Sequence, residues 1–393
     1  MSTQHVETLI IGAGQAGLST GYFLAQHGVS FLIVDGENRV GDNWRHQWDT
    51  LRLYTPAKYD GLPGLPFPAA DPWHFPGKEE VANYLEAYAL HWDLPVRTNT
   101  RIEELVPGPG GGYVATLGPD GSSTISCDSV VIATGTFGRT PKVPAEAGDL
   151  DLDILQLHSS EYRRPSQLRP GRVLVVGASH SGVDVAYETA LTHEVVLCGR
   201  DCGEIPVKFD AKGGRAFLPV MLFIFKHVLN RRTPMGRKEV DHVRFHGGPS
   251  LRLKASELAG RGVERNTARF VGVQDGRPML EDGQVVDAAN VVWCTGFRQV
   301  FDWIKLPIFD GRGWPVEYRG IVEGAPGLYF CGLSFQYAFS SMILPGVGRD
   351  AAFVADAIVA RLRTLRPEPV EGPSTSSGRI GTSSGRGAGL SSR

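Results

Sequence analysis

Short apolar runs alternate with helix-like segments along the chain, and the first alternation begins near the N-terminus. Residues 8–11 are apolar and lead into a glycine, which is typical of a buried parallel strand. Residues 16–26 then show the pattern of a helix that ends before Gly28, and residues 31–34 form a second apolar run. This order predicts a β-α-β unit.

The same plan returns in the middle of the chain. Residues 172–176 and 194–197 are apolar runs, and a helix pattern that reaches about residue 191 lies between them. After each unit comes a further apolar run that ends in Thr-Gly, at residues 130–135 and 291–296. We expect these two runs to be the last strands of two nucleotide-binding domains.

These patterns predict an α/β fold with two Rossmann-like dinucleotide-binding domains, the second inserted into the first. The expected first domain comprises residues 1–145 and 297–365, and the second comprises residues 146–296. The final helix of the first domain is predicted over residues 349–365. Residues 366–393 are mostly Ser, Gly, Pro, Thr and Arg, and they bury too little apolar surface to order, so we expect a disordered tail.

Length, charge and cysteine usage narrow the class of protein. The chain has 393 residues, which suits two domains, and its formal net charge of −2 argues against a nucleic-acid partner. Its five cysteines include no Cys-x-x-Cys pair, and no His pair accompanies Cys198 and Cys202, so neither a dithiol centre nor a metal site is expected. Without a signal peptide or a membrane-length apolar run, the protein is expected to be cytoplasmic and not inserted in a membrane.

The first β-α-β unit carries a glycine-rich loop with the pattern G-x-G-x-x-G. Gly12 permits the tight turn, Gly14 leaves room for a pyrophosphate, and Gly17 lets the helix pack on the strand. Asp35 follows the second strand, where its carboxylate can accept hydrogen bonds from ribose hydroxyls. The alternative is an ordinary glycine-rich turn, but the strand, the helix and the acidic residue together favour dinucleotide binding.

The second loop, Gly177-Ala178-Ser179-His180-Ser181-Gly182, differs from the first in charge as well as sequence. Ser179 replaces the middle glycine and could donate to a phosphate. Gly177 to Arg200 spans 23 positions, as does Gly12 to Asp35. A carboxylate repels a ribose 2′-phosphate and a guanidinium binds one, so the first site is expected to hold FAD or NAD and the second NADP. The alternative for Arg200 is a solvated surface arginine.

Two dinucleotides in one chain imply electron transfer between them. A nicotinamide beside a flavin forms a hydride relay, whereas two nicotinamides offer no obvious net chemistry. We therefore assign FAD to the N-terminal site and NADPH to the second. The protein is predicted to be an oxidoreductase.

Several motifs between the two loops are more specific. They are Val40-Gly41-Asp42-Asn43-Trp44-Arg45, Leu51-Arg52-Leu53-Tyr54-Thr55-Pro56, Pro66-Phe67-Pro68 and Tyr84-Leu85-Glu86-Ala87-Tyr88-Ala89. In this order they resemble the flavin-containing monooxygenase family (class B flavoprotein monooxygenases), and within it the plant auxin-pathway enzymes and their bacterial relatives. The resemblance covers about residues 6–365 and is weakest over residues 201–290.

The resemblance implies an NADPH- and O₂-dependent FAD monooxygenase. In the family, a C4a-hydroperoxyflavin transfers one oxygen atom to a small nucleophilic or carbonyl substrate. The residues that the loops and the resemblance together place at FAD are Gly12, Gly14, Gln15, Ala16, Gly17, Asp35, Gly36, Trp44, Arg45, Thr134, Gly135, Gly332 and Leu333. Those expected at NADPH are Gly177, Ser179, His180, Ser181, Gly182, Arg200, Thr295 and Gly296.

Two departures from the family pattern motivate alternatives. Tyr54 stands where animal members carry an Asn near the reacting flavin edge, which makes Tyr54 the candidate catalytic residue. Leu152 and Ile154 replace the Phe and Gly of a signature that His158 and Tyr162 otherwise match. One alternative is an NADPH-dependent flavin reductase or oxidase that releases H₂O₂ without inserting oxygen, and another is a flavin-loaded redox sensor.

One apolar run lies in the weakly matched stretch. Residues 216–225 are mostly apolar and are followed by Lys226, Arg231, Arg232 and Arg237. A helix that lies on a membrane surface would show this pattern. A helix that lines the substrate entrance is the favoured interpretation.

Overall fold

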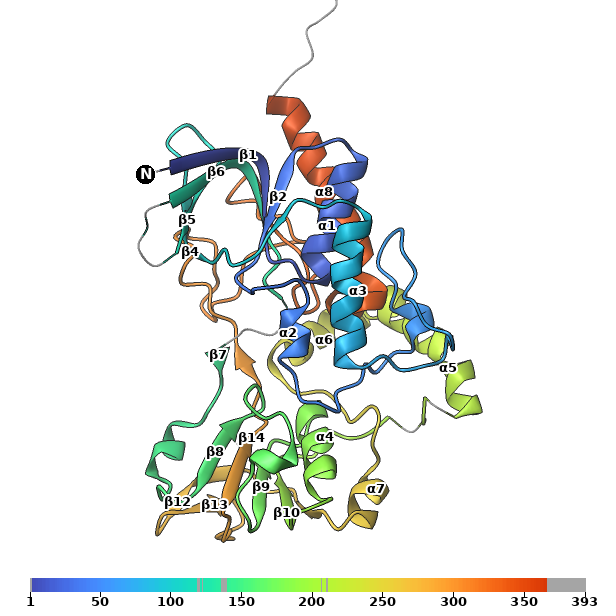
Figure 1. The fold of residues 1–393 in the computed structure, drawn as a ribbon, viewed down its shortest axis with the longest axis vertical. Helices are drawn as coiled ribbons and strands as arrows, with labels where there is room; N and C mark the ends of the chain where they lie inside the picture. The colour runs from blue at the N-terminus through green and yellow to red at the C-terminus, as the bar shows by residue number, and fades with distance from the viewer. Residues whose placement is uncertain are drawn as a thin grey trace, which may run out of the picture.

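The protein has two lobes, each built on its own β-sheet, in the computed structural model (Figure 1). The structure describes residues 2–365 apart from 119, 120, 122, 136–139, 206 and 210. The predicted disordered tail, residues 366–393, lies outside the described residues. Among those that are described, no helix is both long and apolar enough to cross a membrane.

The first lobe contains a seven-stranded sheet in the order β3-β2-β1-β6-β5-β4, with β16 paired to β6. β1 pairs in parallel with β2 and β6, so that Leu9 faces Leu32 on one side and Val130 on the other. β4, β5 and β6 pair antiparallel. The strands are β1 (Ser2–Ile11), β2 (Phe31–Val34), β3 (Val96–Arg97), β4 (Ile102–Pro107), β5 (Tyr113–Leu117), β6 (Ser123–Ile132) and β16 (Leu328–Phe330).

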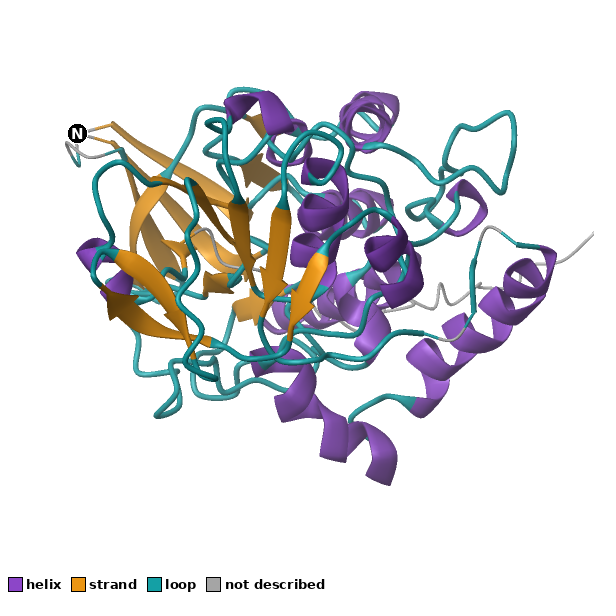
Figure 2. Cartoon of the chain, turned by 90° about the horizontal axis from the view of Figure 1, so that it is seen from below, coloured by secondary structure: helices purple, strands orange, loops and turns teal. Residues whose placement is uncertain are grey.

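Helices cover one face of this sheet, and the molecule seen from below shows most helices gathered beside the strands (Figure 2). α1 and α8 pack together through buried Leu18, Leu24, Val354 and Ile358. α8 begins at Leu344, five residues before the predicted start. The helices are α1 (Gln15–Gln26), α2 (Asp42–Arg45), α3 (Lys78–His91), α4 (His180–Thr189), α5 (Lys212–Phe223), α6 (Pro234–Phe245), α7 (Ala255–Gly260) and α8 (Leu344–Leu365).

The second lobe contains a five-stranded sheet in the order β11-β10-β9-β14-β8, and every pairing in it is parallel. All four residues of β9, β10 and β14 are buried, as the continuous apolar runs predicted. The strands are β8 (Leu155–His158), β9 (Val173–Val176), β10 (Val195–Cys198), β11 (Glu264–Asn266) and β14 (Asn290–Trp293). The predicted α/β class with two Rossmann-like sheets is confirmed.

Small elements link the lobes and complete the second one. β7 (Thr140–Pro141) pairs antiparallel with β15 (Phe297–Arg298), so the chain enters and leaves the second lobe side by side. β12 (Phe270–Gln274) and β13 (Arg277–Leu280) form a separate hairpin. The short helices are the 3₁₀ turns η1 (Ala57–Tyr59), η2 (Ala145–Asp149), η3 (Pro165–Gln167) and η5 (Phe339–Met342), and the π-helical turn η4 (Ile224–Val228).

Only one of the two runs that end in Thr-Gly forms the last strand of its sheet in chain order. The second run forms β14, the last strand of the second sheet in chain order. The first run forms the end of β6, which is a central strand and precedes β16 in the chain, so the expectation that it is the last strand of its domain was wrong. β6 is central because it pairs with β1 along one edge and with β16 along the other, and the apolar residues at its end are buried.

Candidate cofactor and active site

The first glycine-rich loop lies where β1 ends and α1 begins. Gly12 has a φ of +112°, and a Cβ there would collide with the carbonyl of Ala133 at the end of β6. A Cβ on Gly17 would collide with the carbonyl of Gly12. Both glycines are therefore required for the helix, the loop and β6 to approach so closely.

Gly14 has a different role, because the space in front of it is open. It is the N-cap of α1, and an added Cβ would meet no atom of the chain within 4 Å. The N-terminus of a helix carries a partial positive charge and free N–H groups, which suits a phosphate. The cradle therefore fits the pyrophosphate of a dinucleotide without further rearrangement of the loop.

Asp35 lies at the end of β2 and contacts this loop directly. Its Oδ2 accepts a hydrogen bond of 2.6 Å from the Ala13 backbone N–H, and its Oδ1 accepts one of 2.8 Å from Glu37 N–H. Gly36 follows, beside the side chain of Arg101. The carboxylate therefore stands next to the loop and fixes its shape.

Other predicted FAD residues gather around the start of α1. Gln15 donates from Nε2 to the Met342 carbonyl at 3.3 Å, which ties the loop to the segment before α8. A Cβ on Gly332 would meet the Ala16 Cβ at 2.7 Å, and Leu333 is buried beside it. Thr134 and Gly135 are exposed at the end of β6. The ends of β1, β6 and β16 thus converge at one place.

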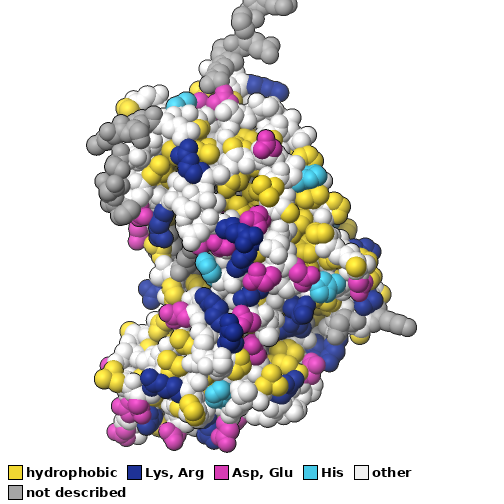
Figure 3. All heavy atoms as spheres, in the orientation of Figure 1, with side chains coloured by type: hydrophobic (Ala, Val, Ile, Leu, Met, Phe, Trp, Pro, Cys, Tyr) yellow, Lys and Arg dark blue, Asp and Glu magenta, His cyan; other side chains and the backbone are white. Residues whose placement is uncertain are grey.

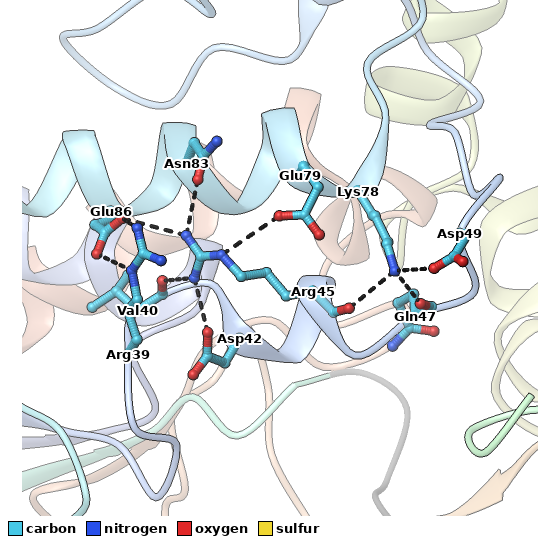
Figure 4. A network of polar contacts seen from close by, with 10 residues as sticks. All are labelled: Arg39, Val40, Asp42, Arg45, Gln47, Asp49, Lys78, Glu79, Asn83 and Glu86. Atoms are coloured by element: carbon cyan, nitrogen blue, oxygen red, sulfur yellow. Dashed lines mark hydrogen bonds and ion pairs between the residues drawn. The ribbon is translucent and has the colours of Figure 1, made fainter. Parts of the chain in front are cut away.

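Trp44 and Arg45, both on α2, have different surroundings. Trp44 is half-buried and packs against the apolar cores of both lobes. The Arg45 guanidinium donates to the Val40 carbonyl at 2.8 Å and to Asp42 at 2.9 Å, and its other nitrogen reaches the α3 side chains Asn83 and Glu86 (Figure 4). This network connects α2 to α3, and Arg45 thereby holds the neighbouring Trp44 in position. The guanidinium donates its hydrogen bonds to other residues of the protein.

The second loop repeats the construction of the first. Gly177 has a φ of +108°, and a Cβ there would collide with the carbonyl of Cys294 at the end of β14. A Cβ on Gly182 would collide with the Gly177 carbonyl. Ser181 lies in the first turn of α4. The two glycine pairs have the same function in the two lobes.

One feature of the second loop has no counterpart in the first. The segment of Gly247, Gly248 and Pro249, which we name the strap, crosses the N-terminus of α4. The Ser179 hydroxyl donates to the Gly248 carbonyl at 2.9 Å, so it does not point to open space as the position of Gly14 does. A Cβ on Gly248 would lie 3.2 Å from the His180 ring. The strap therefore occupies space at the start of α4, where the first loop leaves open space at Gly14.

The remaining predicted NADPH residues lie at the ends of β10 and β14. Arg200 is exposed just after β10, and it has no ion pair among the residues that the structure describes. Thr295 donates from its hydroxyl to the Lys142 carbonyl, and the Gly296 carbonyl accepts from His158 Nε2 at 3.0 Å. His158 is therefore a structural link, because its ring holds the turn after β14 in place.

Sequence reasoning missed Arg265 on β11. Its guanidinium donates to the Leu197 carbonyl at 3.1 Å and to the Gly199 carbonyl at 2.7 Å, so it braces the turn that presents Arg200. No motif marks this arginine, because it lies on a strand 65 positions after Arg200 and reaches Leu197 and Gly199 only in the folded chain. A second arginine therefore lies near Arg200 at this edge of the sheet.

Tyr54 lies between the two lobes and contacts the second loop. Its hydroxyl donates to Asp184 Oδ2 on α4 at 3.3 Å, and its ring lies 5.2 Å from the His180 ring, centroid to centroid. Asp184 also forms an ion pair of 3.1 Å with Arg252. Burial raises the pKa of Tyr54 well above its ordinary value, so the phenol stays protonated and acts as a hydrogen-bond donor.

Burial likewise raises the pKa of Asp184, against the opposing effect of Arg252, and lowers the pKa of His180. The His180 ring is therefore favoured in its neutral form, and its Nε2 has no hydrogen-bond partner among the described residues. A buried nitrogen without a partner, beside a nucleotide loop, is a ready contact for a bound cofactor. Charged side chains of both signs also gather at the surface between the lobes (Figure 3).

Comparisons with known proteins decide the family. A model of the pyridine nucleotide-disulphide oxidoreductase family matches residues 9–205. An oxidoreductase of Geobacillus kaustophilus described as CzcO-like is 34% identical over 375 residues, which cover 91% of this chain and 99% of the relative. The chain belongs to this family.

Two further relatives place it among the flavin monooxygenases of the family. The probable indole-3-pyruvate monooxygenase YUCCA1 of Arabidopsis thaliana is 31% identical over 389 residues, or 91% of each chain. The solved flavin-containing monooxygenase of Stenotrophomonas maltophilia is 26% identical, with a TM-score of 0.71 over 91% of this chain and 99% of that one. The predicted resemblance is confirmed, and this flavin monooxygenase homologue is an NAD(P)H-dependent enzyme with FAD and NADPH as its cofactors.

The disulphide in the family's name does not describe this chain's cysteines. All five are free, and Cys127, Cys198 and Cys331 are buried. Burial raises the pKa of each of these three thiols to about 12, which keeps them protonated and unreactive. The described cysteines thus provide no thiol pair for disulphide exchange.

Proposed function

We propose that the protein is an NADPH- and O₂-dependent FAD monooxygenase that transfers one oxygen atom to a small nucleophilic or carbonyl substrate. FAD is assigned to the loop at Gly14 and NADPH to the loop at Ser179. The observation that supports this assignment is the contrast between Asp35, beside the first loop, and Arg200, beside the second. The corresponding domains would be residues 1–145 with 297–365 for FAD and residues 146–296 for NADPH.

The chain's own residues bind, orient and exclude water. When bound, FAD supplies hydride acceptance from NADPH and the activation of O₂. Gly12, Gly14 and Gly17 leave space for the pyrophosphate at the α1 N-terminus, and Trp44 packs between the lobes. Tyr54, buried against Asp184 and His180, provides a fixed donor at the junction where water must be kept out.

Labelling with ¹⁸O₂ tests the proposal. The purified protein, NADPH and a panel of sulfides, amines, ketones and keto acids are incubated under ¹⁸O₂, with H₂O₂ measured in parallel. Incorporation of one ¹⁸O atom into a product supports the oxygenase. If all electrons from NADPH appear as H₂O₂ for every substrate, the oxygenase proposal is rejected in favour of a flavin reductase or oxidase.

Replacement of Tyr54 by Phe is expected to increase the fraction of NADPH oxidised with release of H₂O₂. The change removes the donor to Asp184 and leaves a buried carboxylate with one partner fewer, so water has better access to the junction. We expect the H₂O₂ fraction to rise by about two- to tenfold, from the loss of about one hydrogen bond. Tyr59→Phe, in η1, is the matched control. An unchanged H₂O₂ fraction in Tyr54→Phe would contradict this role.

Replacement of Ser179 by Ala is expected to strengthen NADP⁺ binding. The Ser179 hydroxyl holds the strap over the second loop, and loss of that hydrogen bond favours displacement of the strap. One hydrogen bond corresponds to about a two- to tenfold lower Kd, measured by calorimetry on the flavin-loaded protein. Ser166→Ala, at an exposed site in η3, should behave as wild type. Weaker binding of NADP⁺ by Ser179→Ala would show instead that the hydroxyl donates to a phosphate.

A further inference from the structure

A hollow lies between the loop after η1, the π-helical turn η4 and the start of α8. It has a volume of about 370 Å³, within the range of small-molecule sites. One wall is the loop of Gly61, Leu62 and Pro63, and another is the start of α8 at Leu344 and Pro345. These walls are largely apolar.

The polar part of the lining is entirely basic. Lys226 and His227 come from η4, and Arg349 comes from the second turn of α8. No Asp or Glu is among the residues that line the hollow. The start of α8, a 22-residue helix, adds the positive end of its dipole at Leu344.

Lys226 and Arg349 are held close together despite their like charges. Arg349 donates to the Lys226 carbonyl at 2.9 Å, and burial together with Arg349 lowers the pKa of Lys226. Within the described part of the chain, the Lys226 ammonium has no hydrogen bond and no ion pair. Arg349 is partly balanced by buried Asp350, 3.6 Å from its Nε. Two adjacent cations, of which only Arg349 has an acidic partner, leave the site short of negative charge.

The positive charge continues beyond the hollow around Tyr337. The guanidinium groups of Arg232, Arg319 and Arg349 lie 5.9, 4.4 and 4.6 Å from the centre of its ring. Glu317, the acid nearest in sequence to Arg319, is paired with Arg231 and Arg244. Because Arg349 also lines the hollow, this group of arginines makes the field beside it positive, and such a field would attract an anion.

The hollow is also next to the proposed FAD site. Leu344, in its wall, is two residues from Met342, whose carbonyl accepts the hydrogen bond from Gln15 in the first glycine-rich loop. A molecule in the hollow would thus lie beside the segment that joins the FAD loop to α8. This position suits a substrate.

We propose that Lys226 and Arg349 form an anion-binding site that selects a substrate with a small apolar body and one negatively charged group. The apolar walls accommodate the body, and the two cations bind the charge. The role of the site in turnover rests on the proposed function, whereas its ability to bind an anion does not. Lys226 is a specificity-determining residue in this account.

Two matched sulfides test the proposal with the FAD-loaded protein: (phenylthio)acetate and its neutral methyl ester. We expect a kcat/KM for the acid at least about tenfold above that for the ester, as one charged contact provides. Lys226→Met should remove this preference by raising KM for the acid. Lys238→Met, at an exposed lysine of α6, should keep the preference.

Binding is measured separately, by titration of benzoate into the FAD-loaded protein and observation of the flavin absorbance. Benzoate binding that is lost in Lys226→Met supports the site, even if all NADPH is converted to H₂O₂ and the oxygenase proposal fails. Equal use of acid and ester, without benzoate binding, would overturn it. Loss of FAD from Lys226→Met would also overturn it, because the cations would then serve the flavin.

Discussion

Arg200→Glu is expected to lower kcat/KM for NADPH about 100-fold and to leave kcat/KM for NADH nearly unchanged. Arg200 lies exposed at the end of β10 and has no ion pair among the described residues, so its charge is available to a ribose 2′-phosphate. Charge reversal replaces an attraction by a repulsion, and about 2.7 kcal/mol corresponds to 100-fold. Steady-state rates of NADPH and NADH oxidation give both constants.

The matched control is Arg172→Glu, at an arginine of the same lobe that is paired with Glu194. It changes net charge equally, but it precedes β9 at the amino ends of the parallel strands, whereas Arg200 follows β10 at their carboxyl ends, so the preference of this variant for NADPH should match wild type. A second variant, Arg265→Gln, tests the brace at Leu197 and Gly199. If Arg265→Gln abolishes the preference and Arg200→Glu does not, Arg265 is the phosphate reader.

Gly14→Val is expected to produce a folded protein that no longer retains FAD. A Cβ added there meets no atom of the chain within 4 Å, so the apoprotein is expected to fold. It would occupy the space of the pyrophosphate, and the overlap is expected to raise the Kd for FAD at least about 100-fold, equivalent to about 2.7 kcal/mol. The bound flavin after purification, read from absorbance, and the thermal midpoint of the apoprotein measure the two effects.

Gly148→Val in η2 provides the control, because Gly148 is also exposed and open in front of its Cα. This variant should retain FAD and melt as wild type does. Gly17→Ala makes the opposite contrast, since its Cβ would collide with the Gly12 carbonyl and should destabilise the fold itself. Full FAD occupancy in Gly14→Val would contradict the assignment of the pyrophosphate to this loop.

The nucleotide loops could be predicted from sequence because their chemistry is local. Gly12, Gly17, Gly177 and Gly182 are spaced by the geometry of a strand, a turn and a helix, and the structure shows that each is needed for a backbone contact. β2 was predicted with its exact bounds for the same reason, since its apolar run is short and bounded. The family followed from motifs whose order could be read directly.

Contacts between distant segments could not be predicted in this way. Asp184 carries no motif, and its partners Tyr54 and Arg252 lie 130 positions before it and 68 after it. The strap over Ser179 likewise depends on how the chain returns after α6. Such pairs are decided by tertiary packing, which hydrophobic periodicity does not report.

The antiparallel strands of the first sheet were missed for another reason. β4 and β5 are short and rich in Gly and Pro at their ends, and they precede β6, where the prediction began only at residue 130. Polar residues from Ser123 onward extend β6 because they pair with β1 and β5 on both edges. Hydrogen bonding to a neighbouring strand on each side thus compensates for the weak apolar pattern of these residues.

The central claim is that the loop at Gly14 binds FAD, the loop beside Arg200 binds NADPH, and electrons pass from NADPH to FAD. Rapid mixing in the absence of oxygen tests this claim most directly. The flavin-loaded protein is mixed anaerobically with NADPH or NADH, and bleaching of the flavin absorbance is followed. The account predicts rapid bleaching by NADPH and much slower bleaching by NADH at equal concentration, with the difference lost in Arg200→Glu. Bleaching at the same rate by both coenzymes, or none by NADPH, would contradict it.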